Sequence, residues 1–336
     1  MQQPKLSIVI PVYNEEDTIP ELHRRLEQFF AGLPLLGGSW EVVFIDDGSR
    51  DRSAALLSAL AAREPRYRLI GFSRNFGHQA AITAGLDRAE GDAVVVMDAD
   101  LQDPPEVVGD MLQKANEGYD VVYGVRRKRH GETLFKRVSA AAFYRFMRAM
   151  TGVDIPLDTG DFRLLRRPVV LTLRALREQH RFVRGMVSWV GFRQTAVYYD
   201  REARFAGETK YPLKRMLRFA VDGITSFSIV PLRIATWLGL LAGTVAVLAG
   251  VLVLVIKMFL PGFVLPGWTG LMVAIAFGFS AQLLMTGILG EYIGRIYEEI
   301  KRRPLYIASQ EVNFAVDSPR APLERTVSVE NGSPLV

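Results

Sequence analysis

The acidic stretch GDAVVVMDADLQDPPE, residues 91–106, combines residue types that can hold a metal ion. Asp98 and Asp100 form an Asp-x-Asp pair, and Gln102 and Asp103 follow closely. Carboxylates this close repel one another unless a cation joins them, and such oxygen ligands suit Mg²⁺ or Mn²⁺, which bind diphosphates well. The pattern therefore predicts a metal and diphosphate site. Because Asp-x-Asp is common by chance, an acidic surface turn is the alternative for the tripeptide alone.

Other polar side chains follow apolar runs elsewhere in the chain. Tyr13 can stack on a nucleobase, while Glu15 and the Asp46, Asp47 pair can accept hydrogen bonds from a base or a ribose. Arg126 is the candidate for contacting phosphate, whereas the basic residues after it are equally well explained as a solvated face. The sequence has no Gly-x-Gly-x-x-Gly and no Gly-x4-Gly-Lys-Ser/Thr loop, so metal and basic side chains must bind the phosphates.

Four short apolar runs are expected to position these groups. Each is typical of a buried strand, and helical patterns of about a dozen residues alternate with them. This alternation predicts an α/β fold with a mainly parallel sheet and helices on both faces. The carboxyl ends of the strands then share one edge, where open α/β sheets bind ligands. Pro11 is expected to end the first strand, and Asn14 to cap the helix after it. The predicted strands are 6–10, 40–45, 67–72 and 93–97.

Composition indicates a second, hydrophobic part. The chain has 336 residues, 49% of them apolar, with a net charge of +5 and no cysteine, which excludes disulfides and thiolate chemistry. Ile234–Ile256 is 23 residues without a charge, and Met258–Gly290 is 33 more, interrupted by the turn PGFVLPG. Each is long enough to cross a hydrocarbon core of about 30 Å. We expect transmembrane helices at about 234–257 and 268–290, with a buried hairpin in a soluble protein as the alternative.

Charge and small residues indicate how this part is placed. Residues 201–233 contain seven basic residues and residues 295–303 contain four, so both flanks are expected in the cytosol. No signal peptide precedes the first strand, which keeps the amino-terminal domain on that side. The spacing of Gly239 and Gly243 lets helices pack closely and predicts a homo-oligomer.

Two amphipathic stretches, 135–149 and 213–227, have basic residues opposite an apolar face. Both are candidates for lying in the lipid headgroup region, and packing on the protein's own sheet is the alternative. The expected organisation is a catalytic domain at 1–210, a juxtamembrane amphipathic helix at 211–230, two transmembrane helices within 231–294, a cytosolic juxtamembrane segment at 295–310 and a disordered tail at 311–336.

Seven motifs together resemble one enzyme family from about Leu6 to Pro304. They are PVYNEE, IDDGSRD, SRNFGHQAA, MDADLQDPPE, GDFRLLRR, RFAGETKYPLKRM and LGEYIGRIYEEIKRRP. This set is similar to the inverting GT-A family 2 polyprenyl-phosphate glycosyltransferases, which include bacterial undecaprenyl-phosphate glucosyltransferases and dolichyl-phosphate mannose synthases. The resemblance implies a GT-A nucleotide-binding sheet followed by interface helices and a two-helix membrane hairpin. It also implies a multi-pass enzyme of the bacterial inner membrane that moves a sugar from a nucleotide sugar to a polyprenyl phosphate. No nucleic-acid partner is expected.

The resemblance implies roles for individual residues. Asp161 faces the reacting centre, with Asp100 and Arg163 as further catalytic residues. The lipid phosphate attacks the anomeric carbon in one in-line displacement, and because this nucleophile is already ionised, Asp161 serves either as a base or to orient the sugar. A loop with Arg204 and Lys210 is a candidate to close over the phosphates. The nucleoside pocket would be lined by Pro11, Tyr13, Glu15, Asp46, Asp47 and Asp98, and Mg²⁺ or Mn²⁺ would be held by Asp98, Asp100 and Gln102.

The donor is the least determined feature. Carboxylates can accept a hydrogen bond from uracil N3–H or guanine N1–H, so the base does not follow from chemistry alone. The GDFRLLRR and RFAGETKYPLKRM stretches most resemble the glucosyl branch, which implies UDP-glucose as donor and a hexosyltransferase activity. Two other functions stay open: a processive polysaccharide synthase, whose Q-x-x-R-W motif is absent, and a membrane scaffold that binds nucleotide sugars without turnover.

Overall fold

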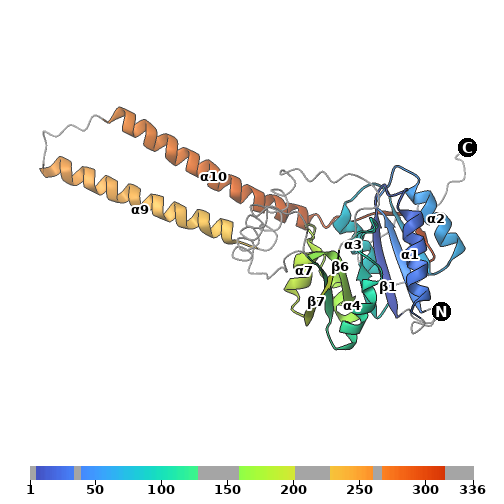
Figure 1. Cartoon of the computed structure of the whole chain (residues 1–336). Coiled ribbons are helices and arrows are strands. Elements are labelled where there is room, and N and C mark those ends of the chain that lie inside the picture. The colour runs from blue at the N-terminus through green and yellow to red at the C-terminus, as the bar shows by residue number, and fades with distance from the viewer. Residues whose placement is uncertain (1–4, 34–38, 128–158, 201–227, 260–266, 315–336) are drawn as a thin grey trace, which may run out of the picture. The chain divides into compact units, whose positions relative to one another are not determined.

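The computed structural model describes residues 5–33, 39–127, 159–200, 228–259 and 267–314 (Figure 1). The chain forms two compact units. One comprises Met1–Arg145, Val153–Leu213 and Arg303–Val336, and the other comprises Phe146–Gly152 and Lys214–Arg302. The amphipathic stretches predicted at 135–149 and 213–227 lie outside the described residues, as do Arg204 and Lys210.

The first unit is built on a sheet whose described strands have the order β7-β5-β6-β4-β1-β2-β3-β8. β4, β1, β2 and β3 are parallel neighbours, which confirms the predicted α/β fold with a mainly parallel sheet. β6 is antiparallel to β4 and β5, and β8 is antiparallel to β3. The strands are β1 (Leu6–Val12), β2 (Trp40–Asp46), β3 (Tyr67–Phe72), β4 (Ala93–Val96), β5 (Val121–Arg126), β6 (Thr159–Arg166), β7 (Gln194–Tyr199) and β8 (Ala308–Val312).

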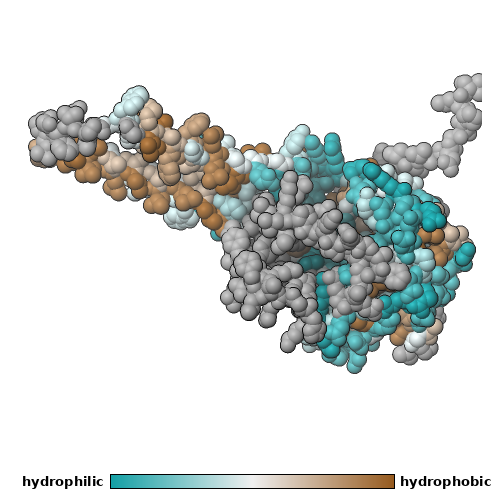
Figure 2. Space-filling view, turned by 45° about the horizontal axis from the view of Figure 1, so that its top comes forward, coloured by the Kyte–Doolittle hydropathy of each residue, from teal (hydrophilic) through white to brown (hydrophobic). Residues whose placement is uncertain are grey.

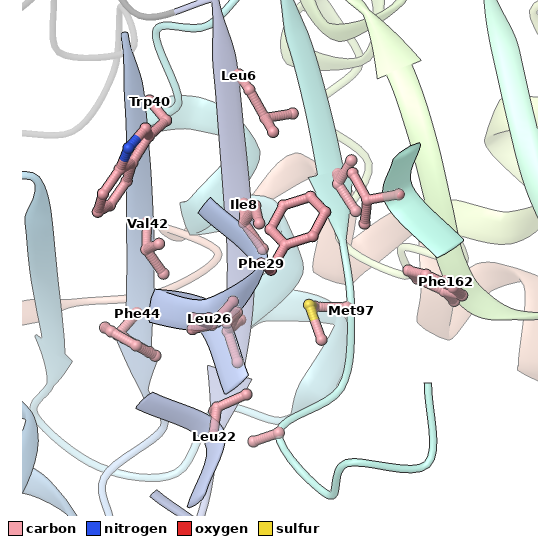
Figure 3. Packing of buried hydrophobic residues seen from close by; sticks show 14 of the residues in the cluster. Leu6, Ile8, Leu22, Leu26, Phe29, Trp40, Val42, Phe44, Met97 and Phe162 are labelled. Atoms are coloured by element: carbon pink, nitrogen blue, oxygen red, sulfur yellow. The ribbon is translucent and has the colours of Figure 1, made fainter. Parts of the chain in front are cut away.

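Helices cover both faces of this sheet, because every residue of β1, β2 and β4 is buried and needs a partner on each side. On one face, Leu22, Leu26 and Phe29 pack over Ile8 and Phe44 (Figure 3). The helices on this face are α1 (Ile19–Ala31), α2 (Ser53–Arg63) and α4 (Val107–Asn116). The other face carries α3 (His78–Arg88) and, in contact with it, α6 (Arg167–Ala175), which α7 (Val183–Trp189) follows.

α3 approaches the sheet closely through Gly85. A Cβ atom at this position would lie 2.1 Å from Val9 Cγ1 and 2.8 Å from Ile45 Cδ1, closer than carbon atoms can pack. Glycine therefore allows the backbone of α3 to rest on the centre of the sheet. This contact determines how close to the sheet α3 lies, and α3 begins at His78.

Two local predictions at the end of β1 are wrong. β1 continues through Pro11 to Val12, because β4 ends opposite Val9 and the missing N–H of proline breaks no bond to that strand. Asn14 does not cap α1, which begins at Ile19. Asn14 instead has a left-handed backbone with φ of 55°, and its side chain accepts a hydrogen bond from the next loop.

The two antiparallel strands change which residues reach the ligand-binding edge. Val96 pairs with Arg163, so the start of β6, and not its end, lies beside the end of β4. Phe72 pairs with Ala308, so the start of β8 lies beside the end of β3. The strand β8 was not predicted: its residues fall in segments expected to be juxtamembrane or disordered, and the structure places them in the sheet of the first unit.

The second unit contains two long helices, α9 (Val230–Phe259) and α10 (Trp268–Ile300). Their apolar spans, Val230–Ile256 and Gly270–Ile300, contain 18-residue windows with mean hydropathies of 2.7 and 1.9, and none of the residues in these windows is buried by the described chain (Figure 2). Helices in a soluble core would be covered, so length, composition and exposure together indicate membrane association. The Tyr292 hydroxyl donates a hydrogen bond of 2.6 Å to the carbonyl of Ser228 within this unit.

Candidate active site

The loops that follow β1 and β2 form one hydrogen-bonded unit. The backbone N–H groups of Asn14 and Glu15 donate to Ser49 Oγ at 3.0 Å and Ser53 Oγ at 2.9 Å. In return, the Arg50 N–H donates to Asn14 Oδ1 at 2.8 Å. Bonds in both directions hold the two loops in a single arrangement before any ligand arrives.

The residues predicted to contact the nucleoside have different surroundings on these loops. Tyr13 is 42% exposed and presents a ring for stacking, whereas Pro11 is buried within β1. The carboxylate of Glu15 accepts a hydrogen bond of 2.9 Å from the Thr18 hydroxyl. Asp46 is 5% exposed and accepts the Ser49 N–H at 3.1 Å. Tyr13 is thus the most accessible of these groups.

Asp47 is turned toward the loop that follows β3. Its Oδ1 accepts the Phe76 N–H at 2.7 Å, and its Oδ2 accepts the Gly77 N–H at 3.0 Å. Burial and the charge of Asp46 raise the pKa of Asp47, although these backbone hydrogen bonds oppose the change. In this structure the carboxylate holds a loop, and its predicted contact with a nucleoside stays a prediction.

Gly48 makes this arrangement possible. Its φ is 68°, in the left-handed region, and a Cβ atom would lie 2.5 Å from the backbone carbon of Arg74. Another residue would be strained and would collide with the loop after β3. Glycine at position 48 is therefore required for the close contact of the two loops.

The acidic motif lies after β4, and its three carboxylates have different environments. Asp103 is 1% exposed, accepts a hydrogen bond from the Tyr199 hydroxyl, and lies 3.8 Å from the Arg126 guanidinium, so protein groups neutralise it. Asp100 Oδ1 accepts the backbone N–H of Gln102 at 3.2 Å. Asp98, at the centre, keeps 31% of its side chain exposed.

Negative charge accumulates around Asp98. Partial burial and the carboxylates of Asp103, Asp161 and Asp100 raise the pKa of Asp98 to about 6, although His78 opposes them. Among the described residues no three His, Cys, Asp or Glu side chains gather as metal ligands. Mg²⁺ typically takes one or two carboxylates together with substrate phosphates, so Asp98 and Asp100 fit a cation that shares its ligands with a diphosphate.

Asp161 lies at the start of β6 among three cationic side chains. Its Oδ2 is 3.1 Å from His78 Nε2, and its Oδ1 is 3.5 Å from Arg184 and 3.8 Å from Arg163. Burial alone would raise the pKa of Asp161, but the hydrogen bond from His78 and the charges of the two arginines outweigh it and hold this pKa well below its usual range. Asp161 is therefore ionised at neutral pH and is a weak base.

Arg163 is the most deeply buried of these cations. It is 3% exposed, and its guanidinium donates to the carbonyl of Gly160 at 2.9 Å. Burial lowers the pKa of Arg163 to about 10, which still leaves it charged at neutral pH. Arg163 and Asp161 form an ion pair, and Arg184 from α7 adds a second arginine.

Arg126 ends β5 and lies against the start of β6. Its Nε is 3.4 Å from the Tyr199 hydroxyl, and a Cβ atom at Gly160 would lie 2.8 Å from its guanidinium. Burial alone would lower the pKa of Arg126, but the hydrogen bond to Tyr199 and the charge of Asp103 raise it. The guanidinium is thus fixed beside the acidic loop, while contact with phosphate stays a prediction.

Two residues of this cluster, His78 and Arg184, were not predicted. His78 Nε2 lies 3.1 Å from Asp161 and 3.6 Å from Asp98, so it joins the acidic loop to β6. A signal was available for His78, because it follows β3 at the same edge of the sheet as the other polar groups. Arg184 had no comparable signal, since it lies within a short helix far from any predicted motif.

Comparison with known proteins identifies the family. The model of the family described as glycosyl transferase family 2 matches residues 7–174. The chain belongs to glycosyl transferase family 2. An uncharacterized glycosyltransferase of Bacillus subtilis (strain 168), YkcC, is 50% identical and covers 94% of this chain and 95% of its own.

Two similar proteins have more specific names. A prophage bactoprenol glucosyl transferase homolog of Escherichia coli (strain K12) is 40% identical to this transferase over 90% of this chain and 98% of its own. A bactoprenol glucosyl transferase of Shigella phage SfV is 40% identical over 91% of this chain and 99% of its own. These matches extend well beyond residue 174 and include most of the chain.

His78 is expected to make the stability of this transferase pH-dependent when divalent cations are removed. Partial burial alone would lower the pKa of His78, but the hydrogen bond to Asp161 and the charges of Asp98 and Asp161 raise it from 6.5 to about 9. The stabilisation is therefore complete below pH 6.5 and is lost as the pH rises through 9. In EDTA, His78→Gln should lower the melting temperature clearly at pH 6.5 and hardly at pH 9.5. An equal decrease at both values would contradict a charged His78.

Proposed function

We propose that this family 2 enzyme transfers glucose from UDP-glucose to a polyprenyl phosphate such as undecaprenyl phosphate. The clustering of Asp98, Asp100 and Asp161 at the edge of the sheet, beside the loops after β1 and β2, carries this proposal. Proteins named as bactoprenol glucosyl transferases that match about nine-tenths of the chain support the choice of sugar and acceptor.

Binding of the donor uses the edge formed by β1, β2 and β4. Tyr13 stacks on the uracil ring, and Asp46 and Glu15 accept hydrogen bonds from the nucleoside. Asp98 and Asp100, with Gln102, would hold Mg²⁺ or Mn²⁺, which offsets the charge of the diphosphate as it leaves. A cation held there would also offset the carboxylate repulsion that, together with burial, raises the pKa of Asp98.

Transfer then proceeds by a single displacement. An oxygen of the lipid phosphate forms a bond to the anomeric carbon while the bond from this carbon to the UDP oxygen breaks, so the configuration inverts and UDP leaves. The attacking oxygen is already ionised, and no proton has to be removed. Asp161, an ionised carboxylate held by three cations, therefore orients the sugar and does not act as a base.

The acceptor is brought by the membrane. We assign α9 and α10 as two spans of the bacterial inner membrane with the transferase unit in the cytoplasm, because basic residues flank the spans on both sides. Arg204 and Lys210 would contact the phosphates together with Arg126. A Cβ atom placed on Gly243 or Gly250 would have no atom of the described chain within 4 Å apart from the neighbouring backbone of its own helix, which leaves room for another copy of the hairpin in a homo-oligomer.

The donor and acceptor can be tested together. Membranes containing the enzyme are incubated with undecaprenyl phosphate and radiolabelled UDP-glucose, UDP-galactose, UDP-N-acetylglucosamine or GDP-mannose, and the lipids are then extracted into organic solvent. We expect UDP-glucose to label the lipid fraction fastest, by about tenfold or more, because a site that pairs a sugar hydroxyl discriminates strongly against sugars that do not place this hydroxyl in the same position. A preference for GDP-mannose would overturn both the base and the sugar.

The same assay separates the other functions. Label in an insoluble polymer would indicate a processive synthase, and binding of UDP-glucose without any product would indicate a scaffold. A matched reaction without undecaprenyl phosphate measures transfer to endogenous lipid. Equal labelling with and without the added lipid, in membranes depleted of polyprenyl phosphate, would contradict the proposed acceptor.

A further inference from the structure

The segment that follows α10, Arg303–Phe314, returns to the sheet of the transferase unit and is named here the C-terminal strap. Its strand β8 pairs with β3 from Leu69↔Val312 to Phe72↔Ala308 and covers the edge of the sheet. The Asn313 amide donates to the carbonyls of Ala61 and Tyr67 at 2.6 and 2.8 Å. The strap is thus attached along the whole length of β3.

The other end of the strap contacts the point where β3 leads into the catalytic loop. The Ser73 N–H donates to the carbonyl of Ile307 at 3.0 Å. The ring of Tyr306 stacks on Phe72, with centroids 5.1 Å apart, and Phe72 packs edge-on against Phe76 at 5.6 Å. The strap thus contacts the SRNFGHQ loop directly at Ser73, and it contacts Phe76 of this loop through Phe72.

Tyr306 is itself held firmly. It is 6% exposed, and its hydroxyl donates to Asp87 Oδ2 at 3.2 Å. Arg177 contacts both oxygens of the same carboxylate at 2.9 Å. A buried ring with a satisfied hydroxyl has few alternative positions, so Tyr306 is a rigid support for Phe72.

The loop between Ser73 and His78 is therefore held on two sides. The strap contacts Phe72 and Ser73, and Phe72 in turn packs against Phe76, while Asp47 accepts the N–H groups of Phe76 and Gly77. His78 follows immediately and reaches Asp161 at 3.1 Å. A shift of this loop would move the imidazole away from the acidic cluster.

We propose that Tyr306 is a positioning residue for glycosyl transfer, and that the C-terminal strap holds the 73–77 loop so that His78 keeps its place between Asp98 and Asp161. Residues that come after the membrane hairpin in the sequence thereby complete the site formed by the first half of the chain. This proposal rests on the transferase activity alone, so it can be tested with whichever donor and acceptor the enzyme prefers.

The test compares two full-length variants that weaken opposite ends of the strap. Tyr306→Leu removes the ring beside Phe72, and Asn313→Ala removes the bonds to Ala61 and Tyr67. We expect Tyr306→Leu to lower kcat about 10- to 100-fold with little change in donor KM, because small misplacements of catalytic groups have effects of this size. Asn313→Ala should lower the melting temperature and leave kcat unchanged. Tyr306→Phe, which keeps the ring, should retain most of the activity.

Hydrogen exchange provides a second readout. In Tyr306→Leu, the Phe76 and Gly77 amides should exchange faster than in the wild type, and in Asn313→Ala they should not. Should Tyr306→Leu fail to fold, Phe76→Leu removes the next ring contact in the same series, between Phe72 and Phe76, and should lower kcat in the same way. Unchanged kcat in the ring variant that folds, or an equal loss of kcat in Asn313→Ala, would show that the strap only stabilises the fold.

Discussion

Replacing Asp100 with alanine is expected to reduce glycosyl transfer more than about a hundredfold, since removal of even an outer partner of a metal ligand costs about 10- to 100-fold. Asp100 accepts the Gln102 N–H within its own loop, so the fold should lose only about 1 kcal/mol of stability. Steady-state transfer rates measure the first effect, and thermal unfolding measures the second. EDTA should abolish transfer by the wild type, and Mg²⁺ or Mn²⁺ should restore it.

The matched control for this experiment is Asp110→Ala. Asp110 is an exposed acid on α4, a short distance along the chain from the acidic loop, and its loss should change neither activity nor cation binding. Binding of Mn²⁺ followed by electron paramagnetic resonance gives a readout that does not depend on turnover, and Asp100→Ala should weaken it. Full activity of Asp100→Ala in the presence of EDTA would remove the proposed cation site.

Asp161→Asn is expected to have the second large effect, on both activity and stability. The carboxylate neutralises Arg163, which is 3% exposed, and breaking a buried ion pair typically costs about 3 to 5 kcal/mol. The variant also loses the anchor of His78 and Arg184, so kcat should fall more than about a hundredfold. Chemical denaturation and transfer rates measure the two losses separately.

A matched control lies at the other end of β6, where this strand pairs with β5. Asp120 and Arg166 form an ion pair of 3.7 Å near the surface, and Asp120→Asn should cost less than about 1 kcal/mol and leave kcat unchanged. Because the pKa of Asp161 lies well below its usual range, the wild-type rate should show no titration of Asp161 between pH 6 and 8. Wild-type kcat in Asp161→Asn would limit this residue to a structural role.

The strands and the acidic motif could be predicted because their signals are local. The β-branched run before Asp98 and the helical patterns between the runs depend on neighbouring residues only, and the structure gives β3 the predicted bounds, Tyr67–Phe72. Asp98 and Asp100 are separated by one residue and come shortly after a buried strand, so their place at the edge followed from the parallel sheet. The two apolar helices were equally evident from hydropathy.

Local signals also led to errors where the chain forms contacts between loops. Asn14 has the residue type and position of a helix cap, yet its side chain accepts the Arg50 N–H from the loop after β2. For Asp47 the sequence could not show that backbone N–H groups of the loop after β3 donate to both of its oxygens, and its predicted contact with a nucleoside stays a prediction. The residue type determines which hydrogen bonds a side chain can form, and the groups that pack against the side chain determine which of these bonds are present.

The sequence by itself thus determined the parallel half of the sheet, the acidic loop with Asp98 and Asp100, and the apolar hairpin, because each depends on periodicity or on residues close together in the chain. Tertiary structure decided the rest. The antiparallel direction of β6 brings Asp161 to the edge, packing of α3 and α7 brings His78 and Arg184 to it, and the return of β8 supports the loop before His78. These contacts join residues far apart in sequence, and they form because buried charges and open strand edges must find partners wherever the folded chain supplies them.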